Sequence, residues 1–241
     1  LEYLEKLIQD EKATAITVVH NDTSNGLVNP IWEIGKLARK YDLMLIVDFV
    51  SAAGCTPFKF DEWGVDAVVT ASQKGLMSPA GMSFCVLSEK AENACATIES
   101  RDFYIDFKSI KKSIEKNGQT PGSTPVSLVL AVHEAVKMIH EEGVENVFAR
   151  HHDLPCRTRA ALQAMGFKLF PETCNFRSDS LTVATPPEGV DIAKLTSYMQ
   201  SEYHLQIGKG LGDYANQTIR IAHMGYCYIE DMIQCIAALE S

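Results

Sequence analysis

The chain has 241 residues, 46% of them hydrophobic, and a formal net charge of −9. This length suffices for one large domain or two smaller ones. No basic block offsets the acidic balance, which argues against a nucleic-acid or anionic-membrane partner. No apolar run reaches the ~18–20 residues that a membrane span needs. Residues 1–16 also lack the basic start and apolar core of a signal peptide.

The seven cysteines are scattered, and no two of them form a CxxC pair. An odd, scattered set of this kind is typical of reduced, buried thiols in a cytoplasmic protein. We therefore expect neither a disulfide framework nor a structural zinc site. The cysteines stand at positions 55, 85, 95, 156, 174, 227 and 235.

The first part of the chain alternates apolar runs with helical spacing. Residues 3–13 read as a helix with no N-cap before it, which suggests that chain is missing upstream. Residues 29–42 predict a second helix with a proline in its first turn. Short apolar runs predict strands at 14–20, 43–50, 66–72 and 82–88. This order favours βαβ units and a largely parallel sheet buried on both faces.

The pattern changes after residue 88. Residues 89–100 are helical, 101–119 are polar and irregular, and 120–125 form a rigid turn. Helical periodicity then runs from 126 to about 165, interrupted near Gly143 and Pro155. The remainder predicts strands at 168–170, 180–185 and 218–223, with helices at about 191–203 and 229–240. The fold class is therefore α/β, a mainly parallel sheet with flanking helices in residues 1–130, followed by a connecting helix and a smaller C-terminal α+β domain in residues 131–241.

Two residues carry the first sign of chemistry. Asp48 ends one apolar strand, and Lys74 follows the next strand in the sequence SQK. Parallel strands present ligand-binding groups at their carboxyl edge. Taken alone, Asp48 could equally cap the next turn, and a lone lysine is most often a solvated surface charge. Together they suit pyridoxal phosphate, whose aldehyde reacts with an amine and whose pyridinium nitrogen pairs with a carboxylate.

A longer signature surrounds this pair. Residues 47–91 contain Asp48, a Ser/Ala/Gly-rich turn, the run WGVD and the run SQKGL in that order. This stretch closely resembles the class V (fold type I) pyridoxal-phosphate aminotransferases, in particular the alanine/serine–glyoxylate branch. The resemblance extends over the chain, from residues 18–26 to residues 219–225. It implies the fold type I large domain, incomplete at its N-terminus.

The resemblance implies a role for several residues around the cofactor. Lys74 matches the lysine that forms the Schiff base and moves the proton between the substrate α-carbon and the cofactor. Asp48 matches the partner of the pyridinium nitrogen, and Val50 matches an apolar residue on one face of the ring. Gln73 matches a glutamine near the phosphate. Ser24 matches a hydroxyl residue near the phenolic oxygen and the substrate.

Other matches concern the substrate and the partner subunit. Asn25 and Gly26 complete the loop that holds Ser24, and we place Asn25 near the substrate. Arg220 matches the arginine that grips the substrate carboxylate in a two-pronged manner, although many strand arginines only pair with a surface acid. Ser123 matches a hydroxyl that reaches the phosphate of the partner subunit in the family's homodimer. The role of Thr120 stays open.

Several further residues are given structural interpretations. His20 and His223 are expected to be satisfied core groups, and His151 and His152 are expected to face solvent. Trp63 is expected to pack between helix and sheet. The sequence leaves open whether Lys209 or Arg177 supplies an extra cation for a phosphonate substrate.

The resulting functional prediction is a ping-pong transaminase that moves an amino group from alanine or serine to glyoxylate or pyruvate. Alternatives are 2-aminoethylphosphonate–pyruvate and ureidoglycine–glyoxylate transamination. Cysteine desulfurases usually carry a histidine before the lysine, where this chain has Gln73. A non-enzymatic alternative is a truncated dimerisation or interaction module, against which the intact Lys74, Asp48 and Arg220 argue.

The resemblance also implies parts that this sequence does not contain. Family members carry an upstream phosphate-binding loop at a helix N-terminus and a residue that stacks on the pyridine ring. No glycine precedes Gly26. We therefore expect this polypeptide by itself to bind pyridoxal phosphate weakly or not at all.

Overall fold

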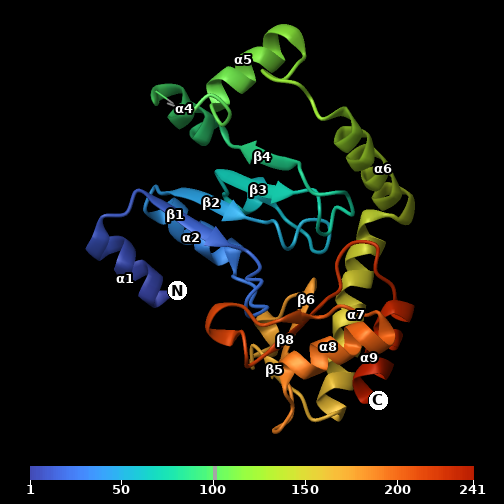
Figure 1. Ribbon diagram of the computed structural model, residues 1–241. Coiled ribbons are helices and arrows are strands. Elements are labelled where there is room, and N and C mark those ends of the chain that lie inside the picture. Colours follow the sequence, from blue (N-terminus) through green and yellow to red (C-terminus); the bar gives the residue numbers. More distant parts are fainter. Residues whose placement is uncertain (100–101) are drawn as a thin grey trace.

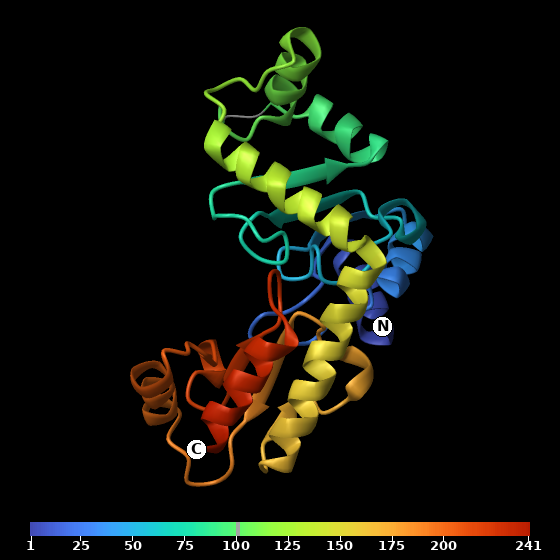
Figure 2. The same cartoon turned by 90° about the vertical axis from the view of Figure 1, so that its right-hand side faces the viewer.

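The computed structural model describes residues 1–99 and 102–241, with the side chain of Cys174 left out. Within this part, two four-stranded sheets lie one above the other in Figure 1. Helix α6 (Val126–Glu142) and helix α7 (Val144–Ala164) connect them along one side of the molecule. Figure 2 shows these two helices running in sequence from beside the first sheet down along the second sheet. None of the described helices is long and apolar enough to span a membrane.

The first sheet contains β1 (Ala15–Val19), β2 (Met44–Asp48), β3 (Ala67–Ala71) and β4 (Ser83–Leu87), in that spatial order. The predicted parallel pairing is confirmed for β1 with β2 and for β2 with β3. Strand β4 is antiparallel to β3. The reason is the connection: a loop without a crossover helix joins β3 to β4, and a parallel pair needs a long crossover.

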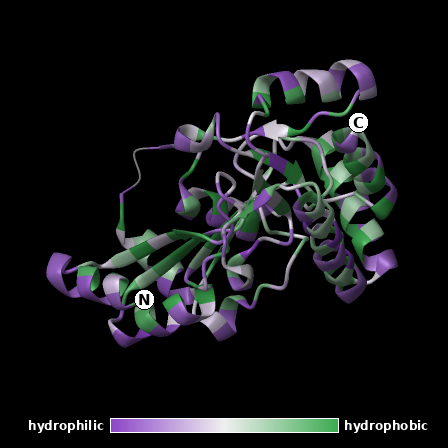
Figure 3. Ribbon diagram, turned by 90° about the horizontal axis from the view of Figure 1, so that it is seen from below, coloured by the Kyte–Doolittle hydropathy of each residue, from purple (hydrophilic) through white to green (hydrophobic). Residues whose placement is uncertain are grey.

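Only one face of the first sheet is covered by the described residues. Helices α1 (Glu2–Glu11) and α2 (Ile31–Lys40) pack on it, and buried aliphatic side chains from α2 and β2 form its core. On the other face, Val19 and Val69, which both pair with Asp48 in the register, are 42% and 37% exposed. The strands beside the N-terminus are largely hydrophobic (Figure 3). The expectation of burial on both faces is therefore wrong for this part of the chain.

Three helices flank the first sheet further along the chain. They are α3 (Phe60–Trp63), α4 (Glu89–Thr97) and α5 (Phe107–Asn117). Helix α5 corrects the prediction of an irregular segment at 101–119, of which residue 101 lies outside the described part. Asp106 caps its N-terminus by accepting from the Lys108 backbone N–H at 3.1 Å, and Gly118 ends it with a φ of 64°. Both are strong helix-boundary residues.

The long helical stretch is interrupted once. Gly143, with a φ of 87°, separates α6 from α7 as predicted. Pro155 does not interrupt α7, contrary to expectation. A proline removes one backbone hydrogen bond, but most helical stability in proteins comes from tertiary packing. Leu154, Thr158 and Leu162 are buried around this position and hold both halves of the helix in place.

The second sheet has the spatial order β5-β6-β8-β7, and its neighbours are antiparallel. Helices α7, α8 and α9 pack against it around Leu162, Met199 and Ile219, which are fully buried. The predicted strands and helices of this region are confirmed, whereas the two-residue β7 is too short for a sequence signal. The elements are β5 (Lys168–Phe170), η1 (Cys174–Phe176), β6 (Leu181–Thr185), α8 (Ile192–Tyr203), β7 (Gly208–Lys209), η2 (Gly212–Tyr214), β8 (Ile219–Ala222) and α9 (Ile229–Glu240). The domain division at residue 130 stays a prediction, since that residue lies inside α6.

Candidate active site

Asp48 and Lys74 lie at the same edge of the first sheet. Asp48 is the last residue of β2, and Lys74 follows β3 by three residues. The two strands are parallel, and Asp48 pairs with Val69 in the register. Arg220 comes from β8 in the second sheet. The structure thus brings an acid, an amine and a guanidinium together from three different strands.

The charges of Asp48 and Arg220 both influence the pKa of the Lys74 amine. Burial lowers the pKa of the half-buried Lys74 amine, Asp48 raises this pKa, and Arg220 lowers it further. Burial also lowers the pKa of Arg220. Desolvation and a neighbouring cation both favour the neutral amine, which is the nucleophilic form of a lysine.

Ser51 connects the amine to the rest of the site. The Lys74 Nζ donates to Ser51 Oγ at 2.6 Å, and the same Oγ lies 2.7 Å from Thr23 Oγ1. The backbone oxygen of Thr23 accepts from Arg220 Nη1 at 3.3 Å. Sequence reasoning named neither Ser51 nor Thr23. Ser51 stands in the Ser/Ala/Gly-rich turn after Asp48, so this turn was the signal that could have found it.

The backbone of Ser51 is held by Asn21, which follows β1, and by Ser180, which precedes β6. The Ser51 carbonyl oxygen accepts from Ser180 Oγ at 2.6 Å and from Asn21 Nδ2 at 3.2 Å. The Asn21 amide also donates to Ser180 Oγ at 2.9 Å. All three residues are buried. Hydrogen bonds between buried groups fix geometry because leaving any partner unpaired is costly.

Two glycines let the turn after β2 touch the turn after β3. A Cβ on Gly75 would lie 2.1 Å from the Ala53 carbonyl oxygen and 2.6 Å from Cys55 Sγ. A Cβ on Gly54, whose φ is +79°, would lie 2.7 Å from the Gly75 oxygen. Only glycine permits this approach. The contact fixes the two turns that carry Ser51 and Lys74 relative to each other.

The other residues predicted to touch the cofactor are placed less uniformly. The Val50 backbone N–H donates to Asp48 Oδ1 at 2.8 Å, and the Val50 side chain is half-buried. Gln73 is exposed next to Lys74. Both lie beside the charged cluster, and their roles toward a cofactor stay predictions.

Ser24 and Asn25 contact a neighbour on their own loop. Ser24 Oγ donates to Asp22 Oδ1 at 2.6 Å, and Asn25 Nδ2 donates to Asp22 Oδ2 at 2.9 Å. Thr23, between Asp22 and Ser24, is the residue whose contacts lead to Lys74 and Arg220. The expected roles of Ser24 and Asn25 therefore stay predictions.

Ser123 lies apart from the cluster in this chain. It is exposed in the turn between α5 and α6, where Thr120 Oγ1 contacts Thr124 Oγ1 at 2.9 Å. In Figure 1 this turn lies above the first sheet, whereas Arg220 comes from the second sheet below it. The placement is compatible with the expectation that Ser123 serves the site of a partner subunit.

The histidines near the site are buried. Burial lowers the pKa of His20 to about 4 and that of His223 to about 3. His223 Nε2 lies 2.8 Å from Thr182 Oγ1, which confirms its interpretation as a satisfied core group. His20 packs edge-on against Phe49, with ring centroids 5.0 Å apart, but its Nδ1 is buried without a partner. His20 is therefore a core group that is not fully satisfied.

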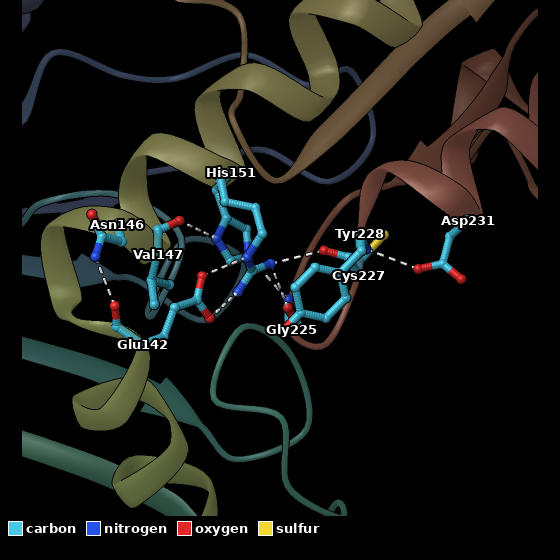
Figure 4. Close-up of polar contacts among 9 residues, drawn as sticks. Glu142, Asn146, Val147, His151, Gly225, Cys227, Tyr228 and Asp231 are labelled. Carbon is cyan, nitrogen blue, oxygen red and sulfur yellow. Dashed lines mark hydrogen bonds and ion pairs between the residues drawn. The ribbon is translucent and has the colours of Figure 1, made fainter.

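His151 corrects an expectation. It is fully buried rather than solvent-facing, whereas His152 is exposed as predicted. The His151 Nδ1 lies 2.7 Å from the Val147 oxygen, and its Nε2 accepts from the Gly225 backbone N–H at 3.1 Å. Figure 4 shows His151 between Val147 and Gly225. The physical reason is its position on the face of α7 that also buries Val147 and Leu154.

Arg150 joins the same part of α7 to the segment before α9. It pairs with Glu142 at 2.7 Å through Nε and at 2.8 Å through Nη2. Its Nη1 donates to the oxygens of Gly225 at 3.1 Å and Cys227 at 2.8 Å. Glu142, Gly225 and Cys227 gather closely in Figure 4. This ion pair fixes the segment whose Gly225 lies against the backbone of Lys74.

A cavity of about 480 Å³ lies next to the site but does not include its charged groups. It opens between the two sheets, on the side of His20, Asn21 and Asp179. Lys74, Asp48 and Arg220 are not among its lining residues. We therefore identify the candidate site from the convergence of charged side chains and not from this cavity.

The sequence matches a family model and is similar to those of several known proteins. The aminotransferase class-V family model matches residues 1–219. An uncharacterised aminotransferase of Methanocaldococcus jannaschii is 38% identical over 227 residues, which cover 94% of this chain and 59% of that protein. The serine–glyoxylate aminotransferase of Methylorubrum extorquens is 36% identical over 239 residues, covering 96% of this chain and 59% of that protein.

The fold is also similar to that of a solved structure of an aminotransferase. The crystal structure of the alanine–glyoxylate aminotransferase from Nostoc sp. superposes with a TM-score of 0.95 at 29% identity, covering 100% of this chain and 64% of that one. The chain thus spans about three fifths of the length of these relatives. On the evidence of the family match and of these similarities, the chain belongs to the class-V aminotransferases.

Proposed function

We propose that the protein is a pyridoxal-phosphate-dependent aminotransferase that moves an amino group from alanine or serine to glyoxylate or pyruvate. The observation that carries this proposal is the convergence of Lys74, Asp48 and Arg220 at one edge of the first sheet. Serine–glyoxylate and alanine–glyoxylate aminotransferases among the similar proteins support the substrate class.

The residues at this edge fit pyridoxal phosphate by their chemistry. The cofactor needs an amine for its aldehyde and a carboxylate for its pyridinium nitrogen, and Lys74 and Asp48 supply them. When bound, pyridoxal phosphate supplies an electron sink for the substrate α-carbon. Val50 and Gln73 would lie beside the ring and the phosphate, and Ser24 near the phenolic oxygen. Ser123 of a second subunit would reach the phosphate.

Each charged residue has a separate task in the reaction. The Lys74 amine takes a proton from the substrate α-carbon and returns it, which requires the neutral amine that burial favours. Asp48 holds the proton on the pyridinium nitrogen through its negative charge. The Arg220 guanidinium is a planar fork for the substrate carboxylate, with Asn25 nearby on the loop. Ser51 orients the Lys74 amine through the bond between them.

The proposal includes a homodimer in the cytoplasm. Ser123 lies apart from the charged cluster of its own chain. This is expected of a residue that reaches the phosphate in the site of a partner subunit. Exposed apolar side chains on both sides of α5 support a subunit contact: Phe103 and Tyr104, before α5, are 76% and 89% exposed, and Leu130, in α6, is 62% exposed. Apolar surface of this kind is typical of protein interfaces.

The test is a half-reaction screen on the full-length protein. Alanine, serine, aminoethylphosphonate and cysteine are offered separately, and absorbance follows the change of the bound cofactor from its aldehyde to its amine form. We expect conversion with alanine or serine, loss of it in Lys74→Ala, and no loss in the control Lys168→Ala, which alters an exposed lysine of β5.

Other outcomes of the screen would replace the proposal. Conversion with aminoethylphosphonate alone would move the substrate to the phosphonates. Release of sulfur from cysteine would indicate a desulfurase. A full-length protein that binds no cofactor would favour a non-catalytic interaction module.

A further inference from the structure

A cysteine, a histidine and an aspartate lie in contact outside the candidate active site. Cys156 Sγ lies 3.9 Å from His152 Nε2, and His152 Nδ1 lies 3.1 Å from Asp179 Oδ1. His152 and Cys156 are one turn apart on α7, where side chains at i and i+4 face each other. Asp179 comes from the segment that leads into β6. The proposed transamination uses none of the three.

The order of Asp179, His152 and Cys156 determines which imidazole nitrogen of His152 carries the proton. A carboxylate only accepts hydrogen bonds, so the contact with Asp179 places the imidazole proton on His152 Nδ1. The Nε2 lone pair is then directed at the Cys156 thiol and can take its proton. A thiol with an adjacent base, which a third group orients, is an activated nucleophile.

The Cys156 sulfur is accessible from solvent. Cys156 is an exposed free cysteine, and the His152 side chain is 71% exposed. The Arg159 guanidinium, one turn further along α7, lies near Cys156 and Asp179 and is held by the Ser178 carbonyl oxygen. Among the described residues no group of three His, Cys, Asp or Glu side chains could hold a metal ion, so metal binding does not explain the cluster.

There is room beside the cluster for a small reagent. His152 and Asp179 both line the cavity of about 480 Å³ between the two sheets. Cys156 is not among the residues that line this cavity, so an approaching molecule reaches its exposed sulfur from solvent. The expectation that the cysteines are buried is wrong at this position, and it is also wrong for the exposed Cys85 on β4.

We propose that Cys156 is a modification site that undergoes thiol–disulfide exchange with low-molecular-weight disulfides, activated by His152 and Asp179. His152 takes the thiol proton, and the Cys156 sulfur attacks one sulfur of the disulfide. The S–S bond of the reagent breaks as the new mixed disulfide forms. The leaving thiolate takes the proton from His152, so that the cysteine is oxidised and half of the reagent is reduced.

The test follows the release of the coloured thiolate from 5,5′-dithiobis(2-nitrobenzoate) at neutral pH on the full-length protein. We expect one fast thiol, whose phase disappears in Cys156→Ser and persists in Cys85→Ser. Cys85 is the control because it is the other exposed free cysteine of the described residues; burial raises the pKa of its thiol. Oxidised glutathione followed by peptide mass spectrometry should place the mixed disulfide on Cys156.

Two further variants test the activation itself. His152→Gln should slow the fast phase by about tenfold, less than a positioned general base gives inside an enzyme, because the pair is exposed. Asp179→Asn should slow it by a smaller factor. The His152 side chain faces solvent, so His152→Gln should fold, which thermal unfolding checks. Equal rates for Cys156 and Cys85, or an unchanged rate in His152→Gln, would overturn the proposal.

Discussion

Replacing Ser51 by alanine tests the arrangement around Lys74 most directly. The change removes the oxygen that accepts from Lys74 Nζ at 2.6 Å. A hydrogen bond to a charged group contributes about 1.5–3 kcal/mol. Because the amine is only half-buried, solvent screens the interaction and we take about 1.4 kcal/mol, which corresponds to a tenfold change in the ratio of ammonium to neutral amine. The bond stabilises the ammonium, so Ser51→Ala should lower the pKa of Lys74 further.

Competitive acetylation of the cofactor-free protein at pH 8 measures this effect. Peptide mass spectrometry gives the labelling rate of Lys74 relative to Lys168, which lies on β5 and serves as an internal reference. We expect the relative rate of Lys74 to rise by up to about tenfold in Ser51→Ala, since only the neutral amine reacts. Thr23→Val is the matched control, because it removes the second partner of Ser51 and keeps the bond to Lys74. A Lys74 rate that stays the same or falls would refute the arrangement.

The remaining predictions concern charge and stability. Asp48→Asn removes the charge that raises the pKa of Lys74, so the acetylation rate should rise, while transaminase activity of the full-length protein should fall by about a hundredfold or more; retained activity would contradict the role of Asp48. Burial lowers the pKa of His20 in the folded state to about 4, from an ordinary value of 6.5. As pH falls, the unfolded chain therefore binds the proton before the folded chain does. The free energy of unfolding should decrease by up to about 3 kcal/mol between pH 6.5 and pH 4. His20→Phe should remove that part of the decrease in urea unfolding at the two pH values, and an equal decrease in the variant would refute the assignment. Arg150→Met should lower the free energy of unfolding by about 3 kcal/mol by leaving Glu142 unpaired, and the double change with Glu142→Leu should regain most of it; no recovery would show that the ion pair is not the cause.

Local patterns predicted the strands of the first sheet and the pairing of its first three. The runs that form β2 and β3 consist mainly of apolar residues, whose exposure to water is unfavourable. Their burial therefore follows from their composition. The missed helix α5 also had local signals, because Asp106 and Gly118 are its caps and Ile110 and Ile114 share one face. Because this segment is rich in charged residues, its sequence pattern predicted an irregular segment in place of helix α5.

Two histidines in the middle of α7 show what a local pattern could not decide. His151 and His152 are adjacent and have the same side chain, yet one is fully buried and the other is exposed. Which one faces inward depends on how α7 is rotated against the second sheet. That rotation is set by packing with residues more than seventy positions away, such as Gly225, which donates to His151.

The sequence by itself determined the class of this protein and singled out Asp48, which ends one strand, and Lys74, which follows the next. The class came from the resemblance of residues 47–91 to a known family, and the meeting of the two residues came from the rule that parallel strands share a carboxyl edge. Only the tertiary structure decided that Ser51 and Thr23 connect Lys74 to Arg220, and that His152, Cys156 and Asp179 meet on another surface. The physical reason is that polar side chains form hydrogen bonds only at short range, and such proximity between distant residues arises from the packing of the two sheets.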